Sequence, residues 1–244
     1  MHLAQSVDAA GSNRWTHVIH HFGGGIASLG AAMAKADLAS LHPGVVATCG
    51  VTDMSDDYVV MPRLSGEAWV DSLRHAATGQ PAASYASTAA WLGVLRSAAE
   101  TLTSIHAAGW THGQVAPHHL WLTPERDVRL IGTSRAARHM SVPKPRPISD
   151  AEFAAPEVVA GGHAVTTASD VYSLGKTLWW TLSQCETPSE NGLPESIADL
   201  ITQMIAPIDA RPSMAQVTEQ LVNFEARAFA LAIRPPATIL RAAA

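Results

Sequence analysis

The chain has 244 residues, of which 47% are apolar and 15% are charged, with a formal net charge of -5 and an isoelectric point near 6.1. This composition is typical of a folded globular protein, and the length suffices for one large domain or two smaller lobes. An acidic chain has no positive field that would attract nucleic acid or anionic lipid, so we expect neither as a partner.

The cysteines and the hydropathy pattern indicate in which compartment of the cell the protein is found. Cys49 and Cys185 form no Cys-x-x-Cys motif, which argues against a disulfide framework or a thiolate metal site. No segment has the pattern of a secretion signal or a membrane span. We therefore expect a cytoplasmic protein.

The first seventy residues have the pattern of a small sheet with one helix. Two apolar runs within residues 1–22 flank the turn sequence DAAGSN, which predicts a β-hairpin. After three glycines, residues 26–41 carry Ala, Leu and Met at helical spacing. Short strands are predicted at residues 45–51 and 57–64.

From Ala68 onward the pattern is mainly helical. A long amphipathic helix is predicted to end at Gly109, and a short hairpin and a loop rich in Pro and Arg follow it. The predicted helices cover residues 88–109, 169–183, 194–206 and 213–232, the hairpin covers 119–132, and the loop covers 141–153. We expect the adjacent Trp179 and Trp180 to pack in the core. The predicted fold class is α+β.

Several motifs occur in an order that is similar to one known family. They are HPGVV at 42–46, YVVMPRLSGEAW at 58–69, EFAAPEVV at 152–159, ASDVYSLGKTL at 168–178 and IDARPS at 208–213. Together they resemble the bacterial Hanks-type (eukaryotic-like) Ser/Thr protein kinases over nearly the whole chain. The resemblance implies a two-lobed kinase-like fold. It places a β-rich N-lobe at residues 1–66, a mainly helical C-lobe at 67–233 and a short tail at 234–244. We expect this N-lobe to lack the first strand and the Gly-rich loop of the family.

The resemblance also marks the positions that would carry phosphoryl transfer. The His-Arg-Asp motif falls on residues 112–114, where Gln114 stands in place of the carboxylate base. The other positions hold Ala116 for the loop Lys, His119 for the metal-binding Asn, Gly132 for the Asp of Asp-Phe-Gly and Val18 for the strand Lys. We therefore expect no catalytic residue, no binding of ATP, magnesium or another cofactor, and a protein that is not an enzyme.

The retained family residues have structural roles. Asp170 resembles the buried Asp that accepts backbone N–H groups of the catalytic loop, Glu157 resembles the acid that pairs with Arg211, and His112 resembles a loop His packed on the core. We therefore predict a catalytically inactive pseudokinase that works by protein–protein contact as an adaptor, scaffold or allosteric regulator. Gln114 and Gly132 have no role in this interpretation, so substituting either by Ala is expected to be nearly silent.

Other functions remain open from the sequence. The cleft where the family binds its nucleotide could bind a small ligand instead. Alternatively, the fold could serve an unorthodox nucleotide-dependent transferase. Histidines gather at 17, 20 and 21 and at 112, 118 and 119, but no carboxylate or Cys stands at a recognised zinc spacing, so we expect no metal site. We expect the strand Met1 to Val7 to be a sheet edge that a partner protein or a second copy covers.

Overall fold

The computed structural model describes the chain in separate ranges. They are residues 2–7, 13–21, 58–62, 64–77, 87–125, 127–132, 135–140, 150–161, 165–184 and 193–232. The predicted helix at 26–41, the strand at 45–51 and the tail at 234–244 lie outside the described residues, as does nearly all of the Pro-rich loop.

The N-terminal segments form a small antiparallel sheet. Its strands are β1 (His2–Val7), β2 (Asn13–His21) and β3 (Tyr58–Pro62), in the order β1-β2-β3. The predicted hairpin is confirmed, because β1 pairs with β2 along its length, with a shift of register between Ala4 and Gln5. Among the described strands, β1 and β3 are therefore the edges of this sheet.

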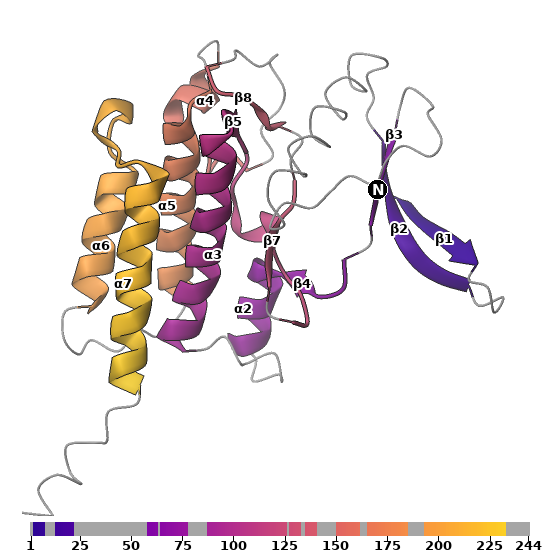
Figure 1. Ribbon diagram of the computed structural model, residues 1–244, viewed down its shortest axis with the longest axis horizontal. Helices are drawn as coiled ribbons and strands as arrows, with labels where there is room; N and C mark the ends of the chain where they lie inside the picture. Colours follow the sequence, from indigo (N-terminus) through magenta and orange to yellow (C-terminus); the bar gives the residue numbers. More distant parts are fainter. Residues whose placement is uncertain are drawn as a thin grey trace, which may run out of the picture.

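The remaining described residues are mainly helical. The main helices are α2 (Trp69–Ala77), α3 (Thr88–Ala107), α5 (Thr167–Gln184), α6 (Leu193–Met204) and α7 (Met214–Ala232), and α3, α5, α6 and α7 lie side by side (Figure 1). The predicted helices after residue 88 are thus confirmed. Of the helices that the structure describes, none combines the length and apolarity that crossing a bilayer needs.

The long helix α3 shows how local chemistry sets its bounds. The Ser87 hydroxyl accepts the backbone N–H of Ala90 at 3.2 Å, which satisfies one of the unpaired donors of the first turn. At the other end, Gly109 has a φ of +78°, a conformation that glycine adopts without strain and that ends the helix.

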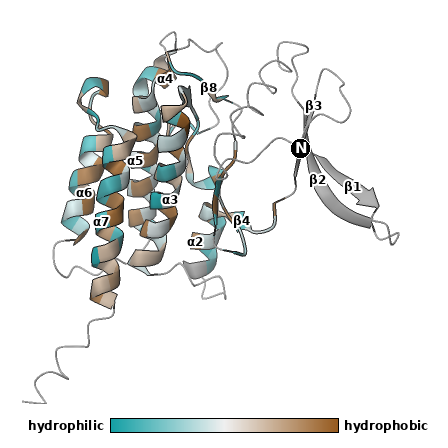
Figure 2. Ribbon diagram, in the orientation of Figure 1, coloured by the Kyte–Doolittle hydropathy of each residue, from teal (hydrophilic) through white to brown (hydrophobic). Residues whose placement is uncertain are grey.

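The apolar faces of these helices form one core. Trp91, Leu92 and Leu102 of α3 have no exposed area, and Leu174 and Leu178 of α5 are 1% exposed. Figure 2 shows apolar and polar residues alternating along these helices, as amphipathic helices require. Each buried aliphatic side chain of this kind stabilises the fold by about 1.5–3 kcal/mol.

Trp179 contradicts the expectation that both tryptophans of α5 pack in the core. Trp179 is 54% exposed, whereas Trp180 packs against the core as a partly buried side chain. The helix turns by about 100° per residue, so the position after buried Leu178 points away from the core. The Lys176 ammonium lies 4.5 Å from the centre of the Trp179 ring instead.

Short strands and turns hold the loops that follow α3. The strands β4 (Glu67–Ala68), β6 (Leu120–Leu122) and β7 (Val128–Leu130) pair in the order β4-β6-β7, and β5 (Trp110–Thr111) pairs with β8 (Ala137–Arg138). The predicted hairpin is thus confirmed as β6 and β7. A 3₁₀ turn at Pro117–His119 precedes β6, a short helix α4 covers Pro156–Ala160, and a second 3₁₀ turn covers Ile208–Ala210.

Candidate functional site

Asp170 connects helix α5 to the loop after β5. Its Oδ2 atom accepts the backbone N–H of His112 at 2.7 Å, and its Oδ1 atom accepts that of Gly113 at 2.8 Å. His106, at the end of α3, lies with Nε2 2.9 Å from the same Oδ2. Burial alone would raise the pKa of the Asp170 carboxyl, but the hydrogen bond and the electrostatic interaction with His106 lower it overall. Asp170 is therefore an ionised, buried carboxylate, and its hydrogen bonds connect α5 to the loop after β5 and to the end of α3.

His112 is fully buried, and its contacts define its protonation state. Its Nε2 lies 3.0 Å from the carbonyl oxygen of Ile131, which can only accept, so Nε2 carries the proton. Its Nδ1 accepts the backbone N–H of Gln114 at 3.3 Å. Burial lowers the pKa of His112, in agreement with a neutral ring. The side chain therefore ties the loop to the segment after β7.

Glu157 and Arg211 form a bidentate ion pair between α4 and the turn before α7. The Arg211 Nη1 donates to Glu157 Oε1 at 2.6 Å and Nη2 donates to Oε2 at 3.1 Å, and the two side chains are 2% and 16% exposed for Arg211 and Glu157. Arg211 also donates to the carbonyls of Ala206 at 2.8 Å and Ala168 at 3.0 Å. Burial alone would raise the pKa of Glu157, but the hydrogen bond from Arg211 lowers it overall.

Gln114 lies next to a carboxylate that the sequence interpretation did not include. Its side-chain amide donates to Asp150 Oδ2 at 3.1 Å. Gln114 itself cannot accept a proton at neutral pH, but the Asp150 carboxylate beside it can. No sequence signal identified Asp150, because it comes from a distant segment with no motif of its own. Ala116, at the position of the loop Lys, is 1% exposed and offers no polar side chain.

The His119 ring packs directly against the backbone of Gly132. Gly132 has a φ of +76°, and a Cβ atom placed on it would lie 2.3 Å from His119 Cδ2 and 2.4 Å from Nε2. The imidazole of His119 thus occupies the space that a side chain at position 132 would need. The structure argues against the expectation that Gly132→Ala is nearly silent, because any Cβ there meets a ring and a strained φ.

The His119 ring is also held by the loop itself. Its Nδ1 lies 2.7 Å from the backbone carbonyl oxygen of Gln114, which fixes the proton on Nδ1 in the neutral ring. Burial, helped by the nearby His112 and His118, lowers the pKa of His119 to about 4 overall. The ring is therefore neutral at physiological pH.

The family's chemistry requires magnesium, so the side chains at positions 119 and 132 decide whether this loop has suitable ligand atoms for that ion. Magnesium prefers oxygen ligands in octahedral geometry. His119 presents nitrogen where an Asn oxygen would serve, and Gly132 has no side chain where a carboxylate would serve. The donor set at these two positions therefore does not fit magnesium. Val18, at the position of the strand Lys, lies in β2, where it pairs with Leu3 of β1 and Met61 of β3.

A small pocket lies beside the loop. Gln114, Asp150, Arg135, Val158 and Ser169 are among the residues that line it. Its free volume of about 10 Å³ is room for about one water molecule. This pocket is therefore too small for a metabolite, whose sites are typically about 300–1,000 Å³.

Comparisons with known proteins agree on the family. A sequence profile of the family described as protein tyrosine and serine/threonine kinase matches residues 31–228. Serine/threonine-protein kinases drp72 of Corynebacterium efficiens is 33% identical over 122 residues, which are 48% of this chain and 22% of that protein. Serine/threonine-protein kinase PknA of Mycobacterium tuberculosis is 32% identical over 143 residues, which are 55% of this chain and 31% of that protein. The chain thus spans less than a third of the length of these relatives.

The chain belongs to the protein tyrosine and serine/threonine kinase family, and its α+β architecture is the kinase-like fold that the motifs indicated. The same finding contradicts the prediction that the chain is not an enzyme, because the matched family and the named relatives are kinases. That prediction counted only residues at the expected positions. It could not detect a group from another segment, such as Asp150, that lies beside one of them.

Proposed function

We propose that this kinase-family domain acts through contact with another protein, as an adaptor, scaffold or allosteric regulator. One observation carries the proposal: the hydrogen bonds that fix the loop are present, whereas the carboxylate base that the family places in this loop is replaced by an amide. Asp170 and His112 hold the loop by hydrogen bonds of 2.7–3.3 Å, while the next residue is an amide, Gln114, at the family's position for a base. A protein contact needs a fixed surface, which these hydrogen bonds supply.

The N-terminal sheet offers a surface for such a contact. Among the described strands, β1 pairs with β2 only, and no other described strand meets the N–H and C=O groups on its other side, where a further strand could pair. Its sequence, HLAQSV, contains no Lys, Arg, Asp or Glu, which are the charges that commonly discourage strand addition at an edge. We infer that an extended segment of a partner protein pairs with β1.

Crosslinking in the native host, followed by mass spectrometry, tests this contact with three matched proteins. They are the wild type, Gln5→Pro in β1, and Asp71→Ala as a surface control on α2. Proline removes a backbone N–H from the strand, so the recovered partner is expected to fall about tenfold or more in Gln5→Pro and to stay unchanged in Asp71→Ala. Unfolding of the helical part of the chain, α2 to α7, is expected at the same midpoint in all three.

Two outcomes would contradict this proposal. If Gln5→Pro and the equivalent Leu3→Pro keep every crosslink while the fold persists, β1 is not the contact surface. If the wild type gives no specific crosslink at native abundance, the protein-contact function itself is wrong. Analytical ultracentrifugation of the pure chain distinguishes a second copy from a different partner, because only self-association shifts the sedimentation rate.

Phosphoryl transfer to a protein is a second candidate, and Asp150 is the observation that favours it beyond family membership. Its carboxylate lies 3.1 Å from the Gln114 amide, so it could accept the proton of a substrate hydroxyl close to the family's base position. In that step the hydroxyl oxygen bonds to the terminal phosphorus of a nucleoside triphosphate, and the nucleoside diphosphate leaves as the old P–O bond breaks. A phosphate-transfer assay on Ser/Thr peptides and on the chain itself tests this candidate. Asp150→Asn is expected to lower the rate about 100-fold or more, and Gln114→Ala to change it little.

The two candidates fail in different ways. Phosphate transfer that survives Asp150→Asn at full rate would exclude Asp150 as the base. No transfer by the wild type under any of the tested conditions would reject the second candidate and leave the protein contact to the crosslinking experiment. A metabolite in the pocket beside the loop has no comparable support, because its free volume of about 10 Å³ holds about one water molecule.

A further inference from the structure

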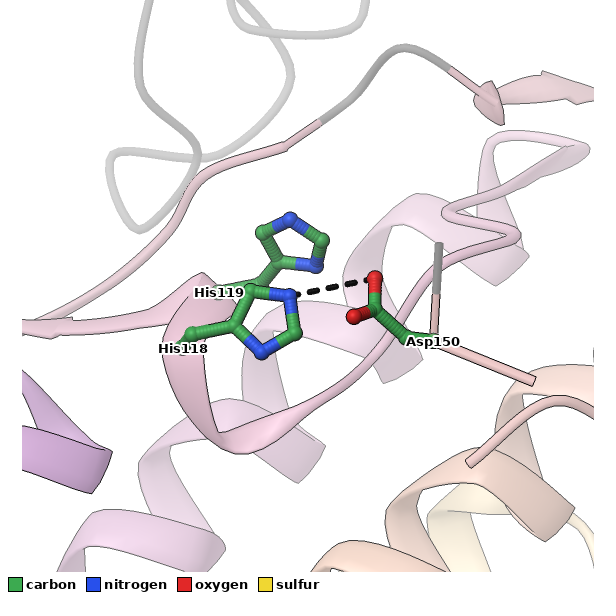
Figure 3. Close-up of side chains that lie close together, drawn as sticks. All are labelled: His118, His119 and Asp150. Atoms are coloured by element: carbon green, nitrogen blue, oxygen red, sulfur yellow. Dashed lines mark ion pairs between the residues drawn. The ribbon is translucent and has the colours of Figure 1, made fainter. Parts of the chain in front are cut away.

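Three possible metal ligands meet at the loop from segments that are far apart in the sequence. His118 and His119 belong to the 3₁₀ turn before β6, and Asp150 precedes α4. One ligand atom from each lies within 4.8 Å of the other two, and His118 Nε2 lies 3.1 Å from Asp150 Oδ2. Figure 3 shows the two imidazole rings side by side and facing the carboxylate.

A histidine beside a carboxylate is not unusual by itself. Elsewhere in the described chain, His75 Nδ1 lies 2.8 Å from Glu67 Oε2 on the surface of the same lobe. The cluster at the loop differs by its second imidazole, because the ring centres of His118 and His119 are 4.1 Å apart at an angle of 56°. A simple ion pair between His118 and Asp150 does not account for this second ring.

The surroundings hold this cluster in place. The His119 ring fills the space over Gly132 and contacts the Gln114 carbonyl through Nδ1, while the Gln114 amide donates to Asp150 Oδ2 at 3.1 Å. Contacts of this kind from neighbouring groups orient metal ligands and commonly alter metal affinity by about 10- to 100-fold. The side chains of His118 and Asp150 are 38% and 18% exposed, so an ion can reach them from solvent.

The donor set determines which ion fits. Two imidazole nitrogens and one carboxylate oxygen are the ligands of many zinc sites with an open fourth position for water. In a tetrahedral zinc site the ligand atoms are about 3.4 Å apart. His118 Nε2 and Asp150 Oδ2 already lie 3.1 Å apart, and the longest of the three separations, which is at most 4.8 Å, needs to contract by no more than about 1.4 Å. The partly exposed side chains of His118 and Asp150 can make this adjustment. Magnesium prefers oxygen ligands and is disfavoured by two imidazoles.

We propose that His118, His119 and Asp150 form a binding site for a late first-row divalent cation of the zinc class. The site lies beside the family's catalytic position but uses a different donor set from the family's magnesium ligands. The proposal does not depend on the proposed function, because it concerns only ion binding by the described residues.

Isothermal titration calorimetry of the full chain with zinc chloride tests the site after dialysis against a chelator. The wild type is expected to bind one zinc ion with saturation in the micromolar range, and cobalt is expected to give the visible absorption of a tetrahedral complex. His118→Ala and Asp150→Asn are each expected to weaken binding by about tenfold or more. His75→Ala is the matched control, and it is expected to bind zinc as the wild type does. His75 is paired with the Glu67 carboxylate, but the two belong to no group of three possible ligands among the described residues.

Four results would overturn the proposal. They are the absence of saturable zinc binding by the wild type, wild-type affinity in both His118→Ala and Asp150→Asn, an equal loss of affinity in His75→Ala, and magnesium binding as tight as zinc. Wild-type affinity in both site variants would place any bound zinc elsewhere, for example at the histidines of β2 or at a cysteine. The unfolding midpoints without metal check that both site variants are folded, and their partly exposed side chains make large changes in stability unexpected.

Discussion

Removing the carboxylate of Glu157 tests the physical account of the helical part of the chain most directly. In Glu157→Ala, the Arg211 guanidinium stays in a site where its side chain is 2% exposed. It loses the hydrogen bonds of 2.6 and 3.1 Å to the carboxylate and keeps those to the carbonyls of Ala206 and Ala168. Breaking a buried ion pair from one side typically costs about 3–5 kcal/mol, because the remaining charge is desolvated without its partner.

That cost is a large part of the stability of an ordinary domain, which is about 5–15 kcal/mol. With a urea m-value of about 3 kcal/mol/M, the unfolding midpoint of Glu157→Ala is expected to fall by about 1–1.7 M. Glu157→Gln keeps the shape and an acceptor for the Ser169 hydroxyl, which now lies 3.0 Å from Oε1, so a smaller loss of about 1.5–3 kcal/mol is expected. Adding Arg211→Met to Glu157→Ala removes the stranded charge, so the double variant is expected to lose less than the sum of the two single losses.

The pair Asp71 and Arg74 provides the control. Its side chains are 49% and 73% exposed for Asp71 and Arg74, so Asp71→Ala is expected to cost at most about 0.5 kcal/mol. The free energies of unfolding come from urea titrations followed by circular dichroism. A Glu157→Ala variant that lies within about 0.5 kcal/mol of Asp71→Ala would refute the reasoning, since burial would then make no difference.

Three further predictions concern the loop. Asp170→Ala leaves the N–H groups of His112 and Gly113 without their acceptor, so a loss of about 3–5 kcal/mol in the same urea assay is expected, and a wild-type midpoint would contradict that role. Gly132→Ala is expected to cost about 1–2 kcal/mol or more, and adding His119→Ala should recover part of that loss; strictly additive losses would mean that the ring and the Cβ do not compete. Burial lowers the pKa of His112 in the native state, so the unfolded chain binds the proton first as pH falls. The contribution of this residue to the free energy of unfolding is therefore full above pH 6.5 and is lost as the pH falls below that value. Urea midpoints measured from pH 7.5 to 5 should fall less steeply in His112→Asn than in the wild type.

Much of the fold was accessible from the sequence, because helices and hairpins depend on neighbouring residues. The apolar spacing at 88–109, 169–183 and 213–232 predicted α3, α5 and α7 within a few residues, since backbone hydrogen bonds in a helix join residues four apart. The turn within residues 1–22 predicted the pairing of β1 and β2 in the same way. The motif order then gave the family, which the profile match at residues 31–228 confirms.

The candidate site was only partly accessible. The positions of Gln114, His119 and Gly132 followed from the motif order, but spacing along the chain could not show that the His119 ring fills the space over Gly132. Nor could it show that Asp150 lies 3.1 Å from Gln114 and from His118. The contact of the His119 ring with a Cβ at position 132 is what argues against a silent Gly132→Ala.

Local sequence thus determined which segments become helices and strands, because those structures close their hydrogen bonds between near neighbours. The tertiary structure decided which side chains meet at the loop, because contacts between segments depend on packing to within about an ångström. The exposure of Trp179 shows the same dependence, since a helical pattern predicts an apolar stripe but only packing decides where the stripe ends. The cluster of His118, His119 and Asp150 could be found only once the fold had brought its two segments together.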